Sequence, residues 1–253
     1  MNNPTLNPAR IAALGRSELT LLVRNRAALS VALLMPAVLV FTLRATVRGD
    51  SAAAVAEATL TGGIGMVLLL VVYMNLVSAY VARREELVLK RLRTGEAADV
   101  EILAGSALPS AAIALAQIAA LVVAGAAVLD APMPQNPALL LAGILGALPL
   151  LASMAALTSS FTRNVETAGL TTMPLFLVTA LGSGLFVRAD VLPDVVASVC
   201  ELLPLSGVMT LIRAGWSGGV AGYDLLGAAL TSLAWMIVTV FAVQRRFRWE
   251  PRR

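Results

Sequence analysis

Long stretches without a single charged side chain dominate this sequence of 253 residues. Five of them approach or exceed the roughly 20 apolar residues that a helix needs to cross the hydrocarbon core of a bilayer. They cover 58–82, 102–129, 131–162, 167–187 and 225–244. A charged side chain at the bilayer centre is costly, so such runs are typical of transmembrane helices. A sixth, shorter run at 27–43 contains Pro36 and is flanked by Arg26 and Arg44, whose long side chains can extend to the membrane interface, so we count it as a span.

We therefore expect an all-α, polytopic membrane protein with six transmembrane helices, organised as one domain over residues 1–253. The spans are predicted near 27–43, 58–82, 102–129, 138–161, 167–187 and 225–244. Composition agrees, because 58% of the residues are hydrophobic and 13% are charged, whereas soluble domains average about 25% charged residues. An ordinary soluble enzyme is excluded.

The distribution of Lys and Arg predicts the orientation, because short loops rich in these residues stay on the cytoplasmic side. With the N-terminus inside, fifteen of the nineteen basic residues fall in cytoplasmic segments. Both termini are therefore predicted to be cytoplasmic. Residues 8–25 place apolar side chains among arginines. This pattern fits an interfacial amphipathic helix, and a cytoplasmic extension of the first span fits it equally well.

The segment between the second and third spans carries a dense run of charges. Residues 83–95 read RREELVLKRLRTG and predict a short amphipathic helix, with Leu87 among its apolar positions. Glu86 and Lys90 are spaced as a favourable i, i+4 pair. Judged by its residues alone, this helix either docks another protein or is a positively charged topogenic loop without a partner.

The segment 189–213 before the last span is apolar but is interrupted by acidic residues and prolines. Apolar segments of about ten residues bounded by prolines are typical of re-entrant or interfacial helices. We expect a re-entrant helical hairpin on the outer side, and an ordinary extracellular loop resting on the bilayer is the alternative. Four glycines that follow are expected in a loop: Gly215, Gly218, Gly219 and Gly222.

Missing residue types exclude several chemistries. The sequence has no histidine, so histidine metal sites, Ser-His-Asp triads and imidazole relays are excluded. Its only lysine, Lys90, follows Leu89 and not the glycine of a P-loop, and Cys200 is its only cysteine. We expect no enzyme activity, metal site or cofactor in this chain. Its basic residues sit between apolar runs, so membrane lipids and not nucleic acid are the expected partner.

Mildly polar residues and methionines lie within the apolar runs. Candidate residues of a substrate pathway are Met74, Asn75, Ser78, Thr171, Thr172 and Met173. Methionine adapts to varied partners, so this combination suits a large amphipathic substrate, and ordinary helix packing accounts for it equally well. The runs contain no Asp, Glu, Lys or Arg, so ion-coupled transport through buried carboxylates has no obvious machinery.

Six spans, a charged helix after the second and a proline-bounded hairpin before the sixth resemble the permease subunits of type-2 ATP-binding-cassette exporters, the small drug and antibiotic efflux group. The resemblance covers essentially the whole chain. The string RREELVLKRLRTGE is similar to the coupling segment of that family, and VLPDVVASVCELLPLSGVMTLIR to its hairpin. Many members place a proline after the small polar residue that ends the coupling helix, whereas here Gly95 follows Thr94.

The resemblance implies a drug efflux permease in a bacterial cytoplasmic membrane. A second copy, as a homodimer, and a cognate ATPase subunit that binds ATP and Mg²⁺ would be its partners. The implied ATPase-coupling residues are Arg84, Glu85, Glu86, Lys90, Arg91 and Arg93, and those of the hairpin are Pro193, Asp194, Glu201, Pro204 and Arg213. The expected substrate is a hydrophobic or amphipathic drug or natural product. The alternatives are a lipid-linked glycan or lipid exporter of the same family, and a non-transporting scaffold or immunity subunit.

Overall fold

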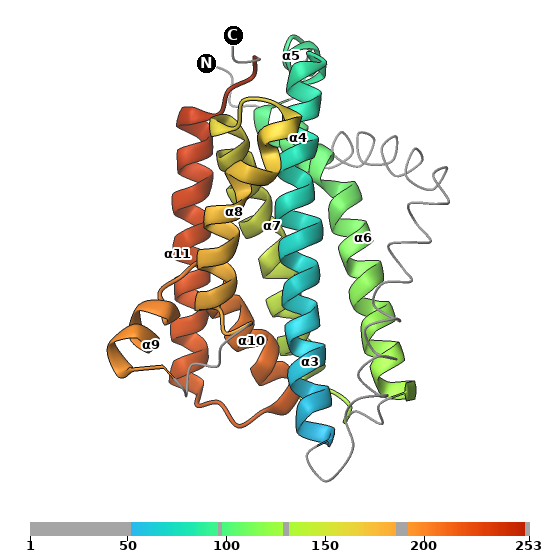
Figure 1. Ribbon diagram of the computed structural model, residues 1–253, viewed down its shortest axis with the longest axis vertical. Coiled ribbons are helices and arrows are strands. Elements are labelled where there is room, and N and C mark those ends of the chain that lie inside the picture. Colours follow the sequence, from blue (N-terminus) through green and yellow to red (C-terminus); the bar gives the residue numbers. More distant parts are fainter. Residues whose placement is uncertain (1–51, 96–97, 129–131, 186–191, 251–253) are drawn as a thin grey trace.

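The computed structural model describes residues 52–95, 98–128, 132–185 and 192–250 of the chain. Within these ranges the chain forms helices and loops and no strand, so the predicted all-α class is confirmed. The long helices run side by side along the longest axis of the molecule (Figure 1). The predicted interfacial helix 8–25 and first span 27–43 lie outside the described residues.

Five helical segments of the described chain are long and apolar enough to cross a bilayer. They are Val55–Glu85, α6 (Asp99–Val128), α7 (Pro137–Phe161), α8 (Val165–Gly182) and α11 (Gly222–Arg246). Each falls where the sequence predicts a span, from the second to the sixth. The largest difference at a described end is in α8, which ends at Gly182 although the prediction runs to 187. The chain is a multi-pass membrane protein.

The first of these segments is not a uniform α-helix. It comprises most of α3 (Ala52–Val67), η1 (Leu68–Met74) and α4 (Asn75–Glu85), of which η1 is a π-helix. Tyr73 in η1 is completely buried, and its hydroxyl oxygen lies 3.2 Å from Oγ1 of Thr158 in α7. The π-helical segment therefore lies in the core of the bundle, and π-helical turns are frequent at functional sites.

Local sequence explains where α7 and α8 begin. The side chain of Asn136 accepts a hydrogen bond from the backbone amide of Leu139 at 3.0 Å, and Pro137 occupies the first turn of α7. Asn164 and Thr167 form a reciprocal capping box at the start of α8. The first amides of a helix have no partner within it, so these side chains fix both N-termini.

The segment before the last span forms two short helices. They are α9 (Asp194–Glu201) and α10 (Ser206–Ser217), and they meet at a bend of 93°. α10 packs between α7 and α11, and most of its residues are buried, whereas α9 has no buried residue. Figure 1 shows α9 projecting from the side of the bundle while α10 lies within it. This arrangement fits the predicted re-entrant hairpin.

Two glycines let α10 approach its neighbours closely. A Cβ at Gly215 would collide with the backbone of Leu140 in α7. A Cβ at Gly207 would collide with the carbonyl oxygen of Ala228 in α11. Small residues at helix contacts allow backbones in a membrane to pack at short range. α10 is therefore held in a slot between α7 and α11 that admits no larger side chain at these two positions.

The four glycines expected in a loop behave differently from one another. That expectation is wrong for Gly215, which belongs to α10, and for Gly222, which is the first residue of α11. Gly218 and Gly219 do lie in the connection, with φ of 69° and 73°. Only glycine adopts such angles without a steric penalty, so these two residues turn the chain from α10 into α11.

Candidate functional site

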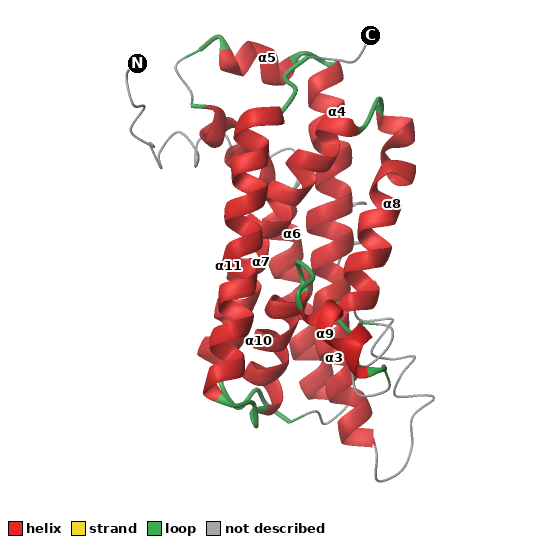
Figure 2. Cartoon of the chain, turned by 90° about the vertical axis from the view of Figure 1, so that its left-hand side faces the viewer, coloured by secondary structure: helices red, strands yellow, loops and turns green. Residues whose placement is uncertain are grey.

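A short helix, α5 (Val88–Arg93), lies across the end of the bundle at which α4 ends (Figure 2). It follows α4 after a turn in which Leu87 has φ of 62°, a left-handed conformation that is uncommon for a bulky residue. Only Leu89 of its six residues is buried. α5 therefore presents most of its surface at this end of the molecule.

The single helix predicted over 83–95 is wrong at Leu87. α4 ends at Glu85, and the chain turns at Glu86 and Leu87 into α5. Glu86 lies in the turn and not on α5, so the predicted pair with Lys90 is not formed. Nζ of Lys90 lies 2.9 Å from Oε1 of Glu250 in the C-terminal tail instead.

Arg84 lies beneath the surface of this end, with 1% of its area exposed. Its guanidinium donates hydrogen bonds to the carbonyl oxygens of Ser159 at 2.7 Å and Thr162 at 2.6 Å. These carbonyls end α7, where a helix lacks partners of its own and where its dipole favours a positive charge. Arg84 thus fastens α4 to α7.

The predicted coupling residues therefore divide into two groups. Arg84 is buried, so it does not share the accessible surface on which a partner would dock. The others are exposed around α5: Glu85, Glu86, Lys90, Arg91 and Arg93. Their role in coupling stays a prediction, and their placement on one accessible surface is compatible with it.

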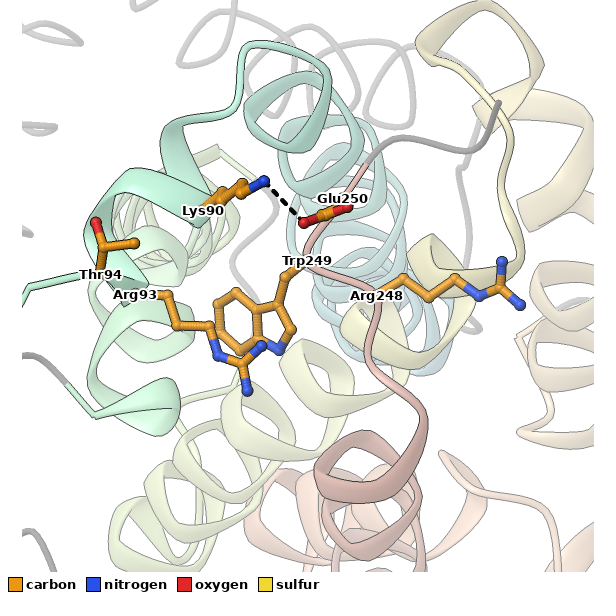
Figure 3. Close-up of a pocket in the computed structure, with 6 residues that line it drawn as sticks. All are labelled: Lys90, Arg93, Thr94, Arg248, Trp249 and Glu250. Atoms are coloured by element: carbon orange, nitrogen blue, oxygen red, sulfur yellow. Dashed lines mark ion pairs between the residues drawn. The ribbon is translucent and has the colours of Figure 1, made fainter.

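The C-terminal tail contributes to this surface, which sequence reasoning missed. A groove of about 640 Å³ lies between α5 and the tail, and Figure 3 shows the six residues that line it: Lys90, Arg93, Thr94, Arg248, Trp249 and Glu250. The guanidinium of Arg93 lies 4.8 Å from the ring centroid of Trp249, and its Nε lies 3.1 Å from Oδ1 of Asp99 in α6. The sequence did contain an indication of this contact. Phe247 and Trp249 closely follow the last span, in a chain in which only 5% of the residues are aromatic.

The residues predicted for the hairpin lie at the opposite end of the bundle. Pro193 precedes the first turn of α9, Asp194 begins that helix and Glu201 ends it, and all three are exposed. Pro204 is buried in the turn between α9 and α10. The two acidic side chains therefore face away from the core.

Comparison with known proteins adds a decisive observation, since residues 9–216 match the family described as the ABC-2 type transporter. The chain belongs to the ABC-2 type transporter family. This ABC-2 chain is the transmembrane component of a transporter and not its ATP-binding part, and the family implies a partner ATPase subunit. The matched region includes α5, α9 and all of α10 except its last residue, and it stops before α11. No curated protein matches the chain.

Arg213 of this ABC-2 permease connects the hairpin to the bundle. Its Nη2 donates to the carbonyl oxygens of Ser183 at 2.8 Å and Gly184 at 2.9 Å, which follow the last turn of α8. The indole nitrogen of Trp235 in α11 donates to the carbonyl oxygen of Leu202 at 2.7 Å. The hairpin is therefore tied to both α8 and α11.

The predicted pathway residues of the permease lie on two neighbouring helical segments. Met74, Asn75 and Ser78 belong to the segment of η1 and α4, and Thr171, Thr172 and Met173 belong to α8, which packs against α4. The hydroxyl groups of Ser78, Thr171 and Thr172 donate to carbonyls of their own helices, as such residues commonly do. Asn75 and Met173 are exposed on the surface of the bundle.

Proposed function

We propose that this chain is the permease of an ATP-driven exporter. It works as a homodimer with two separate ATPase subunits, which bind ATP and Mg²⁺. The observation that carries the proposal is α5, a charged helix displayed at the end of a membrane bundle in a member of the ABC-2 family. A chain without a P-loop needs a partner that hydrolyses ATP, and α5 provides an accessible surface for it.

The contacts around α5 give a physical route for coupling. α5 is joined to α4 by a short turn, and α4 itself directly follows η1 in the core. Arg84 fastens the same end of α4 to α7. Closure of the ATPases would displace α5 and pull on α4 and α7 together. The first, second and fifth spans would then tilt at the seam between two copies and open a route past the α9–α10 hairpin.

The exposed face of α4 and α8 supports a pathway or seam between copies. Asn75 places an amide on the surface within the candidate span Val55–Glu85. An amide that faces hydrocarbon loses its hydrogen bonds to water, which costs free energy. α8 packs against α4 and exposes adaptable or apolar side chains, with Met173 44% and Leu177 47% exposed. This combination favours a hydrophobic or amphipathic drug or natural product as the substrate.

Orientation follows from the basic residues. The end that carries α5 and the last turn of α11 holds Arg83, Arg91, Arg93, Arg245 and Arg246. Under the positive-inside rule this end is cytoplasmic, and the hairpin faces outward. Export from a bacterial cytoplasmic membrane is the direction that the proposal assigns.

The first test is to purify the tagged chain from its native membrane in a mild detergent and to identify the proteins that accompany it. We expect an ATPase subunit in equal amount, and ATP hydrolysis by the complex. Isolation without a nucleotide-binding protein, under conditions that keep other transporter complexes intact, would contradict the proposal and favour a scaffold or immunity subunit.

The second test addresses the substrate. The purified complex is reconstituted in lipid vesicles, and ATP hydrolysis is measured with a panel of amphipathic drugs and with lipid-linked glycans. Stimulation by the drugs supports the assignment. Stimulation by a lipid-linked glycan or a lipid alone would move the protein to the alternative exporter class.

A further inference from the structure

α5 is too short to hold its own position. Six residues form fewer than two turns, and a helix of this length is unstable in isolation because nucleation is costly. Only the side chain of Leu89 is buried against the bundle. A helix that must transmit a displacement therefore needs further contacts to fix its angle.

The C-terminal tail is anchored in the bundle beside α5. α11 ends at Arg246, and the ring of the next residue, Phe247, meets Tyr80 of α4 edge to face, with centroids 6.3 Å apart. Trp249 in turn packs edge to face on Phe247 at 4.8 Å. Aromatic pairs favour this geometry. The rings thus connect the end of α11 to α4, and Phe247 fixes the position of Trp249.

Trp249 and Glu250 then reach α5 itself. The guanidinium of Arg93 lies 4.8 Å from the ring centroid of Trp249, and Lys90 forms an ion pair with Glu250 (Figure 3). A guanidinium over an indole face is attracted by the negative potential of the ring. Arg93 also pairs with Asp99 at the start of α6. The last turn of α5 is therefore held from two sides, by α6 and by the tail.

We propose that the tail after α11 positions α5, with Phe247, Trp249 and Glu250 acting as positioning residues for coupling to the ATPase. This inference rests on the proposed function. The tail continues α11, so it makes the last span and the coupling helix move together. The segment lies beyond the region that matches the ABC-2 family.

The test uses the full-length chain with its cognate ATPase in lipid nanodiscs. Three variants are compared with the unmodified protein: Trp249→Ala, the conservative Trp249→Tyr, and Arg248→Ala as the matched control. Arg248 is the adjacent exposed residue, and its side chain points away from Lys90 and Glu250 in Figure 3. Hydrogen exchange of the α5 amides is measured on the permease alone, and ATP hydrolysis on the complex.

In Trp249→Ala we expect the α5 amides to exchange about fivefold faster, since one cation–π contact is lost. Substrate-stimulated ATP hydrolysis should fall about threefold at saturating ATP, with an unchanged KM for ATP, because the nucleotide site is in the partner. Tyr at position 249 should restore both values, and Arg248→Ala should leave them unchanged.

Unchanged hydrogen exchange of the α5 amides in Trp249→Ala would show that Trp249 does not hold α5 in place. Faster exchange with full coupled hydrolysis would overturn the positioning role. Failure of the proposed function would look different from both outcomes, because the unmodified chain would then bind no ATPase. The exchange measurement on the permease alone would still test whether the tail holds α5.

Discussion

At the scale of single residues, Arg84 and Arg213 make the same kind of contact with the C-terminal end of a helix. Each guanidinium donates two hydrogen bonds to carbonyls at the C-terminal end of a helix, Arg84 at α7 and Arg213 at α8. Backbone carbonyls that water does not reach must be paired with a donor. A cation is the best donor there, because it also matches the negative end of the helix dipole.

Replacing Arg84 by Met should destabilise the bundle. The substitution keeps an apolar stem and leaves the carbonyls of Ser159 and Thr162 without their donor, at a cost of about 2–3 kcal/mol. Thermal unfolding of the purified chain in detergent measures the effect. Arg91→Met is the control, because Arg91 is exposed on α5. Equal midpoints for the two variants would contradict the anchoring role of Arg84.

In the sequence, Arg84 is one of several consecutive charged residues, and nothing there predicts that it is buried while its neighbour is exposed. Arg84 and Glu85 are adjacent, yet one is buried at the end of α7 and the other is exposed. Only the direction of α4 in the bundle decides which of them faces α7. A local pattern of charges carries no information about that contact.

At the scale of elements, α10 depends on close approach to α7. Gly215→Ala should destabilise the hairpin by about 1–3 kcal/mol, because a methyl group would collide with the backbone of Leu140. Gly227→Ala in α11 is the matched control, because a Cβ there meets no atom within 4 Å. Thermal unfolding of both variants checks the prediction, and a Gly215 variant as stable as the control would contradict it.

The exposed acidic residues beside α5 should matter for coupling and not for folding. We expect Glu85→Gln combined with Glu86→Gln to lower ATP-driven transport in vesicles about tenfold, by loss of charge-assisted contacts to the ATPase. The amount of inserted protein should not change, since both side chains are exposed. Glu166→Gln, in the first turn of α8, is the control. Normal transport and ATPase stimulation in the double variant would contradict this role.

The predicted coupling helix shows where sequence reasoning stops at this scale. Apolar periodicity over 83–95 indicated one helix, whereas the helix is interrupted at Leu87, whose left-handed conformation costs about 1–2 kcal/mol. Burial of Leu89 against the bundle favours the observed path of the chain, and the exposed ion pairs of Lys90 and Arg93 add a smaller contribution. A local pattern does not predict a turn that long-range contacts hold in place.

At the scale of the whole molecule, the two ends of the bundle should face different compartments. In a Cys200→Ser background, we expect a membrane-impermeant maleimide to label Asp194→Cys only from outside the cell. Thr94→Cys should react only after the membrane is opened. Both positions are exposed, so access and not burial decides the labelling. Labelling with the opposite sidedness would overturn the orientation given by the positive-inside rule.

The sequence by itself determined the all-helical membrane class of the protein and the approximate places of the five candidate spans that the structure describes. A bilayer penalises every charge and every unpaired backbone group, so each charge-free run in the described part of the chain contains a long helix. Only the tertiary structure decided that Arg84 is buried, that α10 fits between α7 and α11, and that the tail meets α5. Those outcomes depend on contacts between segments distant in sequence, and no local pattern specifies which surfaces meet.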